Sequence, residues 1–402
     1  MGLSMRILVG LILGVISGLI LGPSGVPFAK AWIAPLGTIF MNMIKMIIVP
    51  LVLSSLILGV CGLGDVKKIG RIGGKTIFFY LVTTAVAIVI GLGLGTVMVP
   101  GAGLSIPGGV KTAAKAAPAI SSVIVGIFPT NPFDAMLKGN MLQIIVFALF
   151  VGMGILSVGE KANTVLKFFD GLAEVCYKIV GYIMVFAPIG VFGLIAPVVA
   201  ANGPSVLLPL LKVIIAVYLG CFIHAVVVYG GLLSAIGKLS PLKFFKTILP
   251  AQMIAFTSCS SSGTLPVSME CVGKLGVSPQ ISSFVLPLGA TINMDGTALY
   301  QGVCALFVAQ IYGVNLGPAE YATIIVTGTL ASIGTAGVPG AGFIMLTMIL
   351  TAIGLPLEGS ALIAGIDRVL DMPRTCVNIT GDCCVAYIVD KTERKSELKS
   401  ND

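Results

Sequence analysis

Charged side chains are scarce in this chain. Only 10% of its 402 residues are Asp, Glu, Lys or Arg, whereas 57% are hydrophobic, and the mean hydropathy is +1.08. A soluble globular domain carries about 25% charged residues, so the shortage excludes that class and indicates a polytopic membrane protein. The net charge of +8 does not indicate a nucleic-acid partner, because the basic residues gather between apolar segments without interleaved aromatic residues.

Histidine is nearly absent too, since His224 is the only one. A serine run at Ser258–Ser262 could suggest an intramembrane hydrolase, but nothing supplies its base, so the chain is not predicted to be an enzyme. His224 and Lys212 on the same apolar run could form a proton relay, although a helix–helix hydrogen bond explains His224 better. The nine cysteines lack metal-ligand spacing and are predicted to be core residues.

Apolar runs long enough to span a membrane recur along the chain. We count eight, at residues 5–22, 33–60, 75–99, 141–158, 172–200, 207–237, 282–313 and 359–390. The first is taken as a retained span, because no small-x-small cleavage site follows it. Gly91–Gly95 predicts small-residue packing in the third span, and Pro100–Lys138 is predicted to be a loop. Basic residues follow spans two, six and eight, which places both termini in the cytoplasm.

Two further segments, Pro241–Gly276 and Glu320–Gly354, each have two apolar halves around a centre rich in Gly, Ser and Thr. Each half is too short to cross comfortably, so each segment is predicted to be a re-entrant hairpin, the first cytoplasmic and the second external. Non-helical backbone at membrane depth survives only where it is buried in protein or lines a wet cavity. The pair also indicates an inverted repeat with a midplane binding site.

The last span carries more charge than lipid tolerates. On a helical period, its polar residues fall within an arc of roughly 100°, namely Asp367, Asp371, Arg374, Thr375, Asn378 and Asp382. One ionisable group at the bilayer centre costs about 2.5–3.5 kcal/mol, so the stripe indicates a protein-lined cavity or a path for an ion or substrate. Pro373 frees a backbone carbonyl near the middle of this stripe.

The seventh span is interrupted at Gly289–Thr297. Asp295 within this break requires a cation or a hydrogen-bond donor. An unwound turn exposes carbonyls, and together with a carboxylate, an Asn side chain and hydroxyls these form a hard-oxygen set suited to an alkali-metal ion. A small hydroxyl patch is predicted in the third span from Tyr80, Thr83 and Thr84.

Four motifs resemble those of the dicarboxylate/amino acid:cation symporters, the family that includes the glutamate and aspartate transporters. They are SSSGTLP at Ser260–Pro266, NMDGTALYQ at Asn293–Gln301, ASIGTAGVPGAG at Ala331–Gly342 and LDMPRTCVNITGD at Leu370–Asp382. The resemblance covers nearly the whole chain. It implies a glutamate-transporter-like fold of eight transmembrane helices plus two re-entrant helical hairpins that close over the substrate as inner and outer gates.

The resemblance also implies a homotrimer in a bacterial or archaeal plasma membrane, with transport domains that slide against a fixed scaffold. Spans one and two (1–70) and spans four and five (141–200) correspond to the scaffold. Span three (75–99) and residues 207–391 correspond to the transport domain. Residues 100–140 correspond to an extracellular loop and residues 392–402 to a cytoplasmic tail.

Site roles follow from the same resemblance. Asp371 is similar to the carboxylate that takes the substrate's amino group, and Arg374 to the guanidinium that takes its side-chain carboxylate, which its planar fork matches. Further implied substrate contacts are Thr297, Thr375, Asn378 and the backbone of Ser260, Ser261, Gly337, Val338 and Gly342. Three implied sodium sites comprise Asp382, Asn378, Asn293 and the Gly289 carbonyl; Thr291, Ser332, Ile333 and Thr335; and Tyr80, Thr83, Thr84, Asn293 and Asp295. No other cofactor is implied.

The resemblance therefore implies a sodium-coupled symporter of acidic amino acids, aspartate, glutamate or both, that works by elevator-type alternating access. Gln301 stands where proton-coupled eukaryotic relatives carry a titratable Glu. Cys259 stands where archaeal relatives carry an Arg, and Met372-Pro373 stands where eukaryotic relatives place a second one, so this auxiliary charge is missing or supplied by Arg368.

Two alternatives stay open. One is a C4-dicarboxylate or neutral amino acid symporter of the same family. The other, from a different class, is an ion channel, because glycine-rich hairpins and polar helix faces also build pores. An ion-only pore would not need a paired Asp371 and Arg374.

Overall fold

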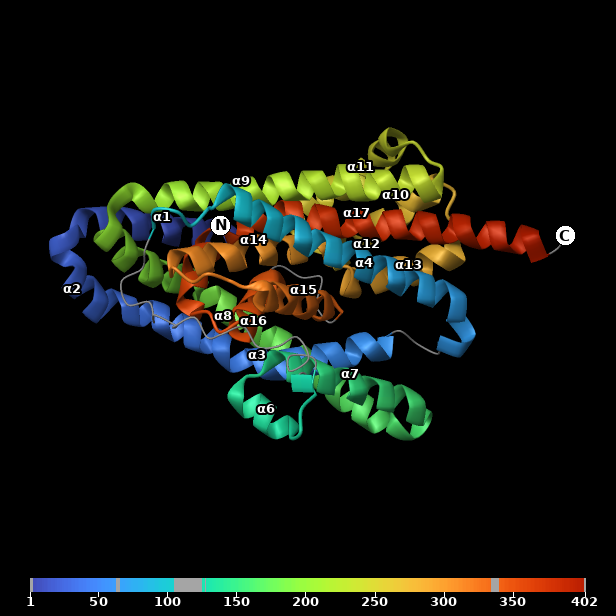
Figure 1. The fold of residues 1–402 in the computed structure, drawn as a ribbon, viewed down its shortest axis with the longest axis horizontal. Helices are drawn as coiled ribbons and strands as arrows, with labels where there is room; N and C mark the ends of the chain where they lie inside the picture. The colour runs from blue at the N-terminus through green and yellow to red at the C-terminus, as the bar shows by residue number, and fades with distance from the viewer. Residues whose placement is uncertain (1–2, 63–65, 105–124, 127, 334–339, 401–402) are drawn as a thin grey trace.

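The computed structural model describes residues 3–62, 66–104, 125–126, 128–333 and 340–400, and every regular element within them is helical. The long helices lie side by side along the longest axis of the molecule, and the end of the last one extends beyond the others (Figure 1). The helices of more than ten residues are α1 (Leu3–Leu21), α3 (Ala34–Gly62), α4 (Val66–Met98), α7 (Met141–Val158), α8 (Asn163–Asn202), α9 (Leu207–Ile223), α11 (Pro241–Ser258), α12 (Ser261–Lys274), α13 (Pro279–Ile292), α14 (Asp295–Ile311), α15 (Pro318–Ser332), α16 (Ala341–Ala352) and α17 (Ser360–Ser400), and the short helix α6 covers Pro132–Lys138.

Short helical turns complete the fold. The one-turn helices α2 (Val26–Phe28) and α10 (Gly230–Leu232) lie beside π-helical turns at Ala29–Ile33, His224–Tyr229 and Leu233–Gly237. The predicted loop Pro100–Lys138 contains α6, which the sequence reading did not predict. Asn131 starts this helix, because its side chain accepts the N–H of Phe133 at 2.9 Å and of Asp134 at 3.4 Å.

Helices occupy the predicted spans, but several run past the apolar boundaries. α4 begins at Val66, α8 begins at Asn163 and α17 continues to Ser400, each about two to three turns beyond the hydrophobic run. Hydropathy marks where a helix would leave lipid, whereas the helix itself continues through polar residues of good helix propensity until a break or cap.

Fewer helices qualify as spans by length and apolarity alone. Within the part of the chain that the structure describes, three helices are long and apolar enough to cross a membrane, or four if a pair bent by 101° counts as one span: Arg71–Met98, Val146–Ile183, Leu207–Gly237 and the pair Val9–Leu21 with Pro23–Phe40. The chain is therefore an all-helical membrane protein, and the count of eight spans stays a prediction.

One group of helices, α1, α3, α7 and α8, packs largely on itself. The glycines of α1 at four-residue spacing lie against α8, where a Cβ atom at Gly18 would come within 2.6 Å of Val199 and one at Gly14 within 3.2 Å of Ile195. Close backbone approach through small residues is what associates helices in lipid, where a hydrophobic driving force is lacking.

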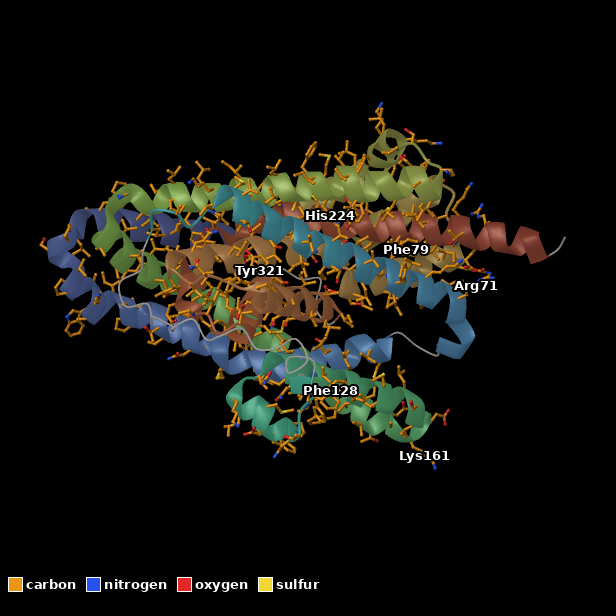
Figure 2. The ribbon with its side chains drawn as sticks, viewed as in Figure 1. Arg71, Phe79, Phe128, Lys161, His224 and Tyr321 are labelled. Carbon is orange, nitrogen blue, oxygen red and sulfur yellow. The ribbon has the colours of Figure 1, made fainter. Side chains whose placement is uncertain are left out.

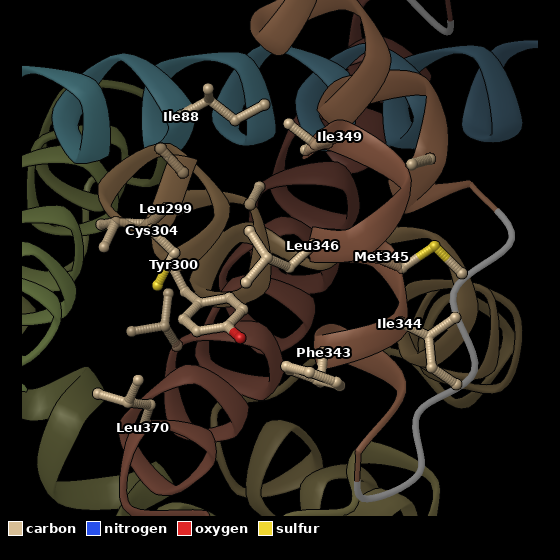
Figure 3. Packing of buried hydrophobic residues seen from close by; sticks show 14 of the residues in the cluster. Ile88, Leu299, Tyr300, Cys304, Phe343, Ile344, Met345, Leu346, Ile349 and Leu370 are labelled. Carbon is tan, nitrogen blue, oxygen red and sulfur yellow. The ribbon is translucent and has the colours of Figure 1, made fainter. Parts of the chain in front are cut away.

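The remaining helices form a second group around α14 and α17. α4 lies along α14, with Gly91 facing Leu299 and Gly95 facing Leu306, so the predicted small-residue packing of Gly91–Gly95 is confirmed for these two positions. Figure 3 shows buried apolar residues of α4, α14, α16 and α17 meeting, among them Ile88, Leu346 and Leu370. This core surrounds the polar face of α17.

Breaks in the helices occur where the sequence predicts them. Only Asn293 and Met294 separate α13 from α14. α11 and α12 meet at Cys259, whose φ of 54° is left-handed, and at Ser260, whose hydroxyl caps α12 by accepting the N–H of Gly263 at 3.0 Å. α15 and α16 form the second predicted pair, and residues 334–339 between them lie outside the described residues.

Candidate functional site

The polar face of α17 centres on Arg374, which has no solvent exposure. Its Nη1 donates to Asp367 Oδ1 at 2.9 Å, and its Nη2 lies 2.9 Å from Asp371 Oδ1. Its Cζ lies 4.0 Å from the centroid of the Tyr300 ring. Two carboxylates and an aromatic face thus hold one guanidinium, and the predicted arc of α17 is a buried charge cluster.

Two guanidinium nitrogens of Arg374 have no hydrogen-bond partner within the described residues. These are Nε and Nη2, although Nη2 is within ion-pair distance of Asp371. An unsatisfied buried donor costs about 1–3 kcal/mol, and more when it is charged. These two N–H groups belong to one edge of the guanidinium fork, which suits a carboxylate bound in two places.

The start of α16 reaches this cluster. The N–H of Gly340 donates to Asp371 Oδ2 at 3.4 Å, and the Thr375 hydroxyl lies 3.5 Å from Asp371 Oδ1. A Cβ atom at Gly342 would lie 3.1 Å from Thr297 Cγ2 and 3.3 Å from Arg374 Cζ, so a larger residue there would press on both side chains. The predicted contacts Gly342, Thr297, Asp371, Arg374 and Thr375 are therefore brought together, whereas Gly337 and Val338 lie outside the described residues.

The tip between α11 and α12 meets α17 at Arg368. Its Nη2 donates to the carbonyl of Thr257 at 3.0 Å and lies 3.4 Å from that of Ser258, which are the last carbonyls of α11. Cations favour a helix C-terminus, so this contact holds the tip. Cys259 is 2% exposed, and the charges of Asp371, Arg368 and Arg374 are close enough to interact with its side chain. Arg368 thus brings positive charge to the tip that Cys259 itself lacks, and Ser260 and Ser261 follow directly.

A second polar cluster joins the α13–α14 break to α17. Asn293 Nδ2 donates to Asp382 Oδ1 at 2.9 Å and to the Asn378 carbonyl at 3.0 Å, while Asn378 Oδ1 accepts the N–H of Gly296 at 2.8 Å. Asn378 Nδ2 also lies 3.5 Å from Thr297 Oγ1. Asp382, Asn378 and Asn293 therefore meet. Gly289 lies beside them, since a Cβ atom there would overlap Asp382 Oδ1 and the Tyr80 hydroxyl, and its carbonyl accepts the backbone N–H of Asn293 at 2.8 Å.

This second cluster fits a hard cation. Asn293 Oδ1 is buried without a hydrogen-bond partner among the described residues, and Asp382 is a buried carboxylate beside it. Carboxylate, amide and carbonyl oxygens are the ligands that hard cations take. Across the described ranges, no three His, Cys, Asp or Glu side chains gather as a transition-metal site requires. Asn378, Asn293, Asp382 and Gly289 are therefore the residues that could hold a sodium ion.

Asp295 receives donors from three sides. Its Oδ1 accepts from Thr84 Oγ1 at 2.5 Å, and its Oδ2 accepts from the Tyr229 hydroxyl at 2.6 Å and lies 3.1 Å from His224 Nε2. Figure 2 places His224 near the middle of the long axis. The interpretation of His224 as a helix–helix hydrogen-bonding residue is confirmed, and so is the need of Asp295 for donors.

Of the other predicted cation ligands, Thr291, Ser332 and Thr83 bond within their own helices, whereas Tyr80 and Thr84 bond to neighbouring ones. Thr291 is exposed and donates to the Leu288 carbonyl at 2.9 Å, and Ser332 donates to the Thr329 carbonyl at 2.7 Å. Ile333 ends α15, and Thr335 lies outside the described residues. In α4, Thr83 donates to the Tyr80 carbonyl at 3.2 Å, and Tyr80 donates across to the Val285 carbonyl at 3.0 Å. The second and third sets stay predictions.

Three residues of the site had no predicted role. Asp367 belongs to the predicted arc, and its position seven residues before Arg374 on the same face was a usable signal. Tyr300 lies inside the NMDGTALYQ motif, but nothing in the sequence aims its ring at Arg374. Tyr229 contacts Asp295 from a π-helical turn, and no sequence signal pairs the two.

Comparisons with known proteins point to the same family as the sequence motifs. Residues 3–392 match the family described as the sodium:dicarboxylate symporter family. The chain is 39% identical over 401 residues to the proton/sodium-glutamate symport protein of Bacillus caldotenax, covering 98% of this chain and 94% of that protein. It is 36% identical to the proton/glutamate-aspartate symporter of Escherichia coli (strain K12), with 99% and 94% covered. It is 35% identical to the C4-dicarboxylate transport protein of Bacillus subtilis (strain 168), with 99% and 95% covered.

Proposed function

Because the chain belongs to the sodium:dicarboxylate symporter family, a family of transporters and not of enzymes, we propose that it is a sodium-coupled symporter of acidic amino acids. The substrate is aspartate, glutamate or both. The observation that carries the proposal is the buried pair of Asp371 and Arg374, whose charges lie 2.9 Å apart while two guanidinium nitrogens have no hydrogen-bond partner within the described residues. An acidic amino acid carries the ammonium and the carboxylate that complement this pair.

Substrate binding exchanges one ion pair for two. The substrate's ammonium takes Asp371, and its side-chain carboxylate takes Nε and Nη2 of Arg374, while Asp367 keeps Nη1 in place at 2.9 Å. The α-carboxylate is left for the backbone N–H groups of the two tips, at Ser260, Ser261, Gly337, Val338 and Gly342, where α12 and α16 begin. Helix N-termini present unpaired N–H groups and favour anions. Thr297, Thr375 and Asn378 complete the contacts.

A C4-dicarboxylate is the rival substrate, because one relative bears that name. It lacks an ammonium, so it would leave Asp371 without a cation and set a second carboxylate close to it. Like charges in a buried site disfavour each other strongly. A neutral amino acid would instead bring no carboxylate to Nε and Nη2 of Arg374, which have no hydrogen-bond partner within the part of the chain that the structure describes. Both mismatches favour an acidic amino acid.

Sodium is the proposed coupling ion, although the names of the relatives include both protons and sodium. The set of Asp382, Asn378, Asn293 and the Gly289 carbonyl is the best supported, since one Asn293 oxygen lacks a partner within the described residues. When bound there, sodium compensates the buried charge of Asp382. Further ions are proposed at Thr291, Ser332, Ile333 and Thr335, and at Tyr80, Thr83, Thr84, Asn293 and Asp295. Gln301 is 2% exposed and cannot carry a proton.

Elevator-type movement is proposed for the two helix groups. α1, α3, α7 and α8 form the scaffold of a homotrimer, and α4, α9 and α11–α17 form the transport domain, with eight spans, an inverted repeat and both termini in the cytoplasm. Denser packing within each group than between them supports the division. α16 touches α7 across this boundary. A disulfide engineered between them should stop transport if the groups slide, and transport at the full rate would contradict the division.

Substrate competition tests the proposal. In liposomes with an inward sodium gradient, uptake of labelled aspartate should be inhibited by unlabelled aspartate or glutamate, and far less by succinate or serine. One missing charged partner in a buried pair typically costs about 2–5 kcal/mol, or roughly 30-fold or more in affinity. Succinate that competes as well as aspartate would overturn the acidic amino acid in favour of the C4-dicarboxylate.

A further inference from the structure

The hydroxyl of Tyr218 on α9 donates to the backbone carbonyl of Val369 on α17 across 3.1 Å. Val369 is the tenth residue of the 41-residue helix α17, inside the helix, where a carbonyl normally accepts the N–H four residues later. That later residue is Pro373, which has no N–H. Tyr218 therefore supplies the donor that the proline removes.

Tyr218 and the proline break have mostly apolar surroundings. Tyr218 and Pro373 line the same pocket of about 220 Å³ between α9, α11 and α17, together with apolar side chains such as Phe222, Phe256 and Val377. Phe222 is 66% exposed at the surface of the protein, where lipid would face it. In a membrane-spanning helix, a carbonyl freed by a proline must be satisfied by a neighbouring helix, a hydroxyl side chain or an ordered water, and Tyr218 of the neighbouring α9 is such a partner.

The break lies between the two charged residues of the proposed substrate site. Pro373 follows Asp371 by two residues and directly precedes Arg374. The backbone from Val369 to Pro373 thus sets the direction in which both side chains leave α17. None of the sequence motifs contains Tyr218, and among the described residues its hydroxyl bonds to Val369 and not to Asp371 or Arg374.

We propose that Tyr218 is a positioning residue for the substrate site: its hydrogen bond to Val369 holds the proline break of α17 in the form that aims Asp371 and Arg374 at one substrate. The proposal depends on the proposed function only in the experiment that measures transport. The hydrogen bond itself can be tested without any substrate, so failure of the two can be told apart.

A double-mutant cycle tests the bond. Tyr218→Phe removes only the hydroxyl, and Pro373→Ala restores the N–H that Val369 would accept in an unbroken helix. In detergent without substrate, Tyr218→Phe should lower the unfolding temperature in the native background and leave it nearly unchanged in Pro373→Ala. Tyr182→Phe is the matched control, because Tyr182 is exposed on α8. Equal effects of Tyr218→Phe in both backgrounds, or no effect in either, would overturn the bond.

Transport tests the positioning role. Tyr218→Phe should raise the KM for aspartate at least about fivefold, the smallest effect expected of an unsatisfied buried acceptor, and change kcat less. A purely structural role would lower the amount of folded protein and leave the KM unchanged. Tyr218→Phe in the Pro373→Ala background should leave the KM of Pro373→Ala nearly unaltered. A KM for Tyr218→Phe equal to that of the unmutated protein would remove Tyr218 from the site's support.

Discussion

The guanidinium of Arg374 stacks on the ring of Tyr300, with Cζ 4.0 Å from the ring centroid. Both residues are fully buried, so water does not weaken the attraction between the cation and the negative face of the ring. Asp367 also holds the guanidinium, by accepting from Nη1 at 2.9 Å. The Arg374 fork is thereby held in one plane before any substrate arrives.

Loss of the ring should therefore weaken binding of acidic substrates. A desolvated cation–π contact contributes about 2 kcal/mol, so Tyr300→Leu should lower aspartate affinity by up to roughly 30-fold. Tyr300→Phe retains the ring face and is the matched control. Aspartate binding by the purified proteins, titrated at saturating sodium, measures the difference. Equal affinity in Tyr300→Leu and Tyr300→Phe would show that stacking does not organise the site.

Removal of the guanidinium should change the substrate class. Arg374→Cys takes away one member of a buried charge pair, which typically costs about 2–5 kcal/mol, and aspartate affinity should fall roughly 30- to several thousand-fold. Asp371 and the backbone N–H groups of the tips still hold an amino acid's main chain, so serine or alanine should now compete better than aspartate. Arg6→Cys, an exposed charge on α1, is the control. Undiminished competition by aspartate in Arg374→Cys would refute the assignment.

Asp382→Asn tests the best supported cation site. The substitution keeps the shape and the oxygen that accepts from Asn293, but it removes the negative charge that binds a hard cation. Sodium should then activate transport only at higher concentration. Apparent aspartate affinity at fixed sodium should fall about 5- to 150-fold, since coupling between two ligands is reciprocal. The exposed Asp134→Asn provides the control, and an unchanged sodium dependence in Asp382→Asn would exclude this site.

The stability of the protein is expected to depend on pH through Glu393, which lies beyond the last predicted span. Burial alone raises the pKa of Glu393, but hydrogen bonds from Arg71 and Lys75, each at 2.6 Å, outweigh it and lower the pKa below its usual 4.5. Figure 2 places Arg71 towards the end where α17 leaves the other helices. A depressed pKa in the folded state gives stability that is present above the unfolded pKa and lost as pH falls through the folded one.

Glu393→Gln should therefore lower the unfolding temperature at neutral pH, and the difference should vanish well below pH 4.5. The effect is small, about 1 kcal/mol or less, because the Arg71 side chain is 57% exposed. Glu160→Gln, an exposed substitution, should behave as the unmutated protein at every pH. A difference that grows on acidification would contradict the sign of this contribution.

The sequence could predict those parts of the site that lie on one helix, because they depend only on helical periodicity. The arc from Asp367 to Asp382 follows from helical geometry alone, and it becomes one buried face because lipid cannot accept those charges. Turn-forming residues likewise predicted the breaks at Asn293 and at Cys259. That Pro373 frees a backbone carbonyl was also predictable, because proline has no N–H.

Contacts between helices could not be predicted in the same way. Which residue reaches Arg374, Asp295 or Val369 depends on helix rotation and crossing, and these are set by packing across segments far apart in the chain. Tyr300, Tyr229 and Tyr218 are such residues. Each has an apolar ring that fits any buried helix face, so nothing in the sequence marks its hydroxyl or ring as part of a site.

Sodium-driven accumulation tests the central proposal most directly. The purified protein in liposomes should concentrate labelled aspartate when an inward sodium gradient is imposed at equal pH on both sides. Uptake should cease to be concentrative in sodium-free buffer, even with an imposed pH gradient, because Gln301 cannot titrate and the cation set around Asp382 stays unfilled. Concentrative uptake that persists without sodium under the pH gradient would contradict sodium-coupled symport.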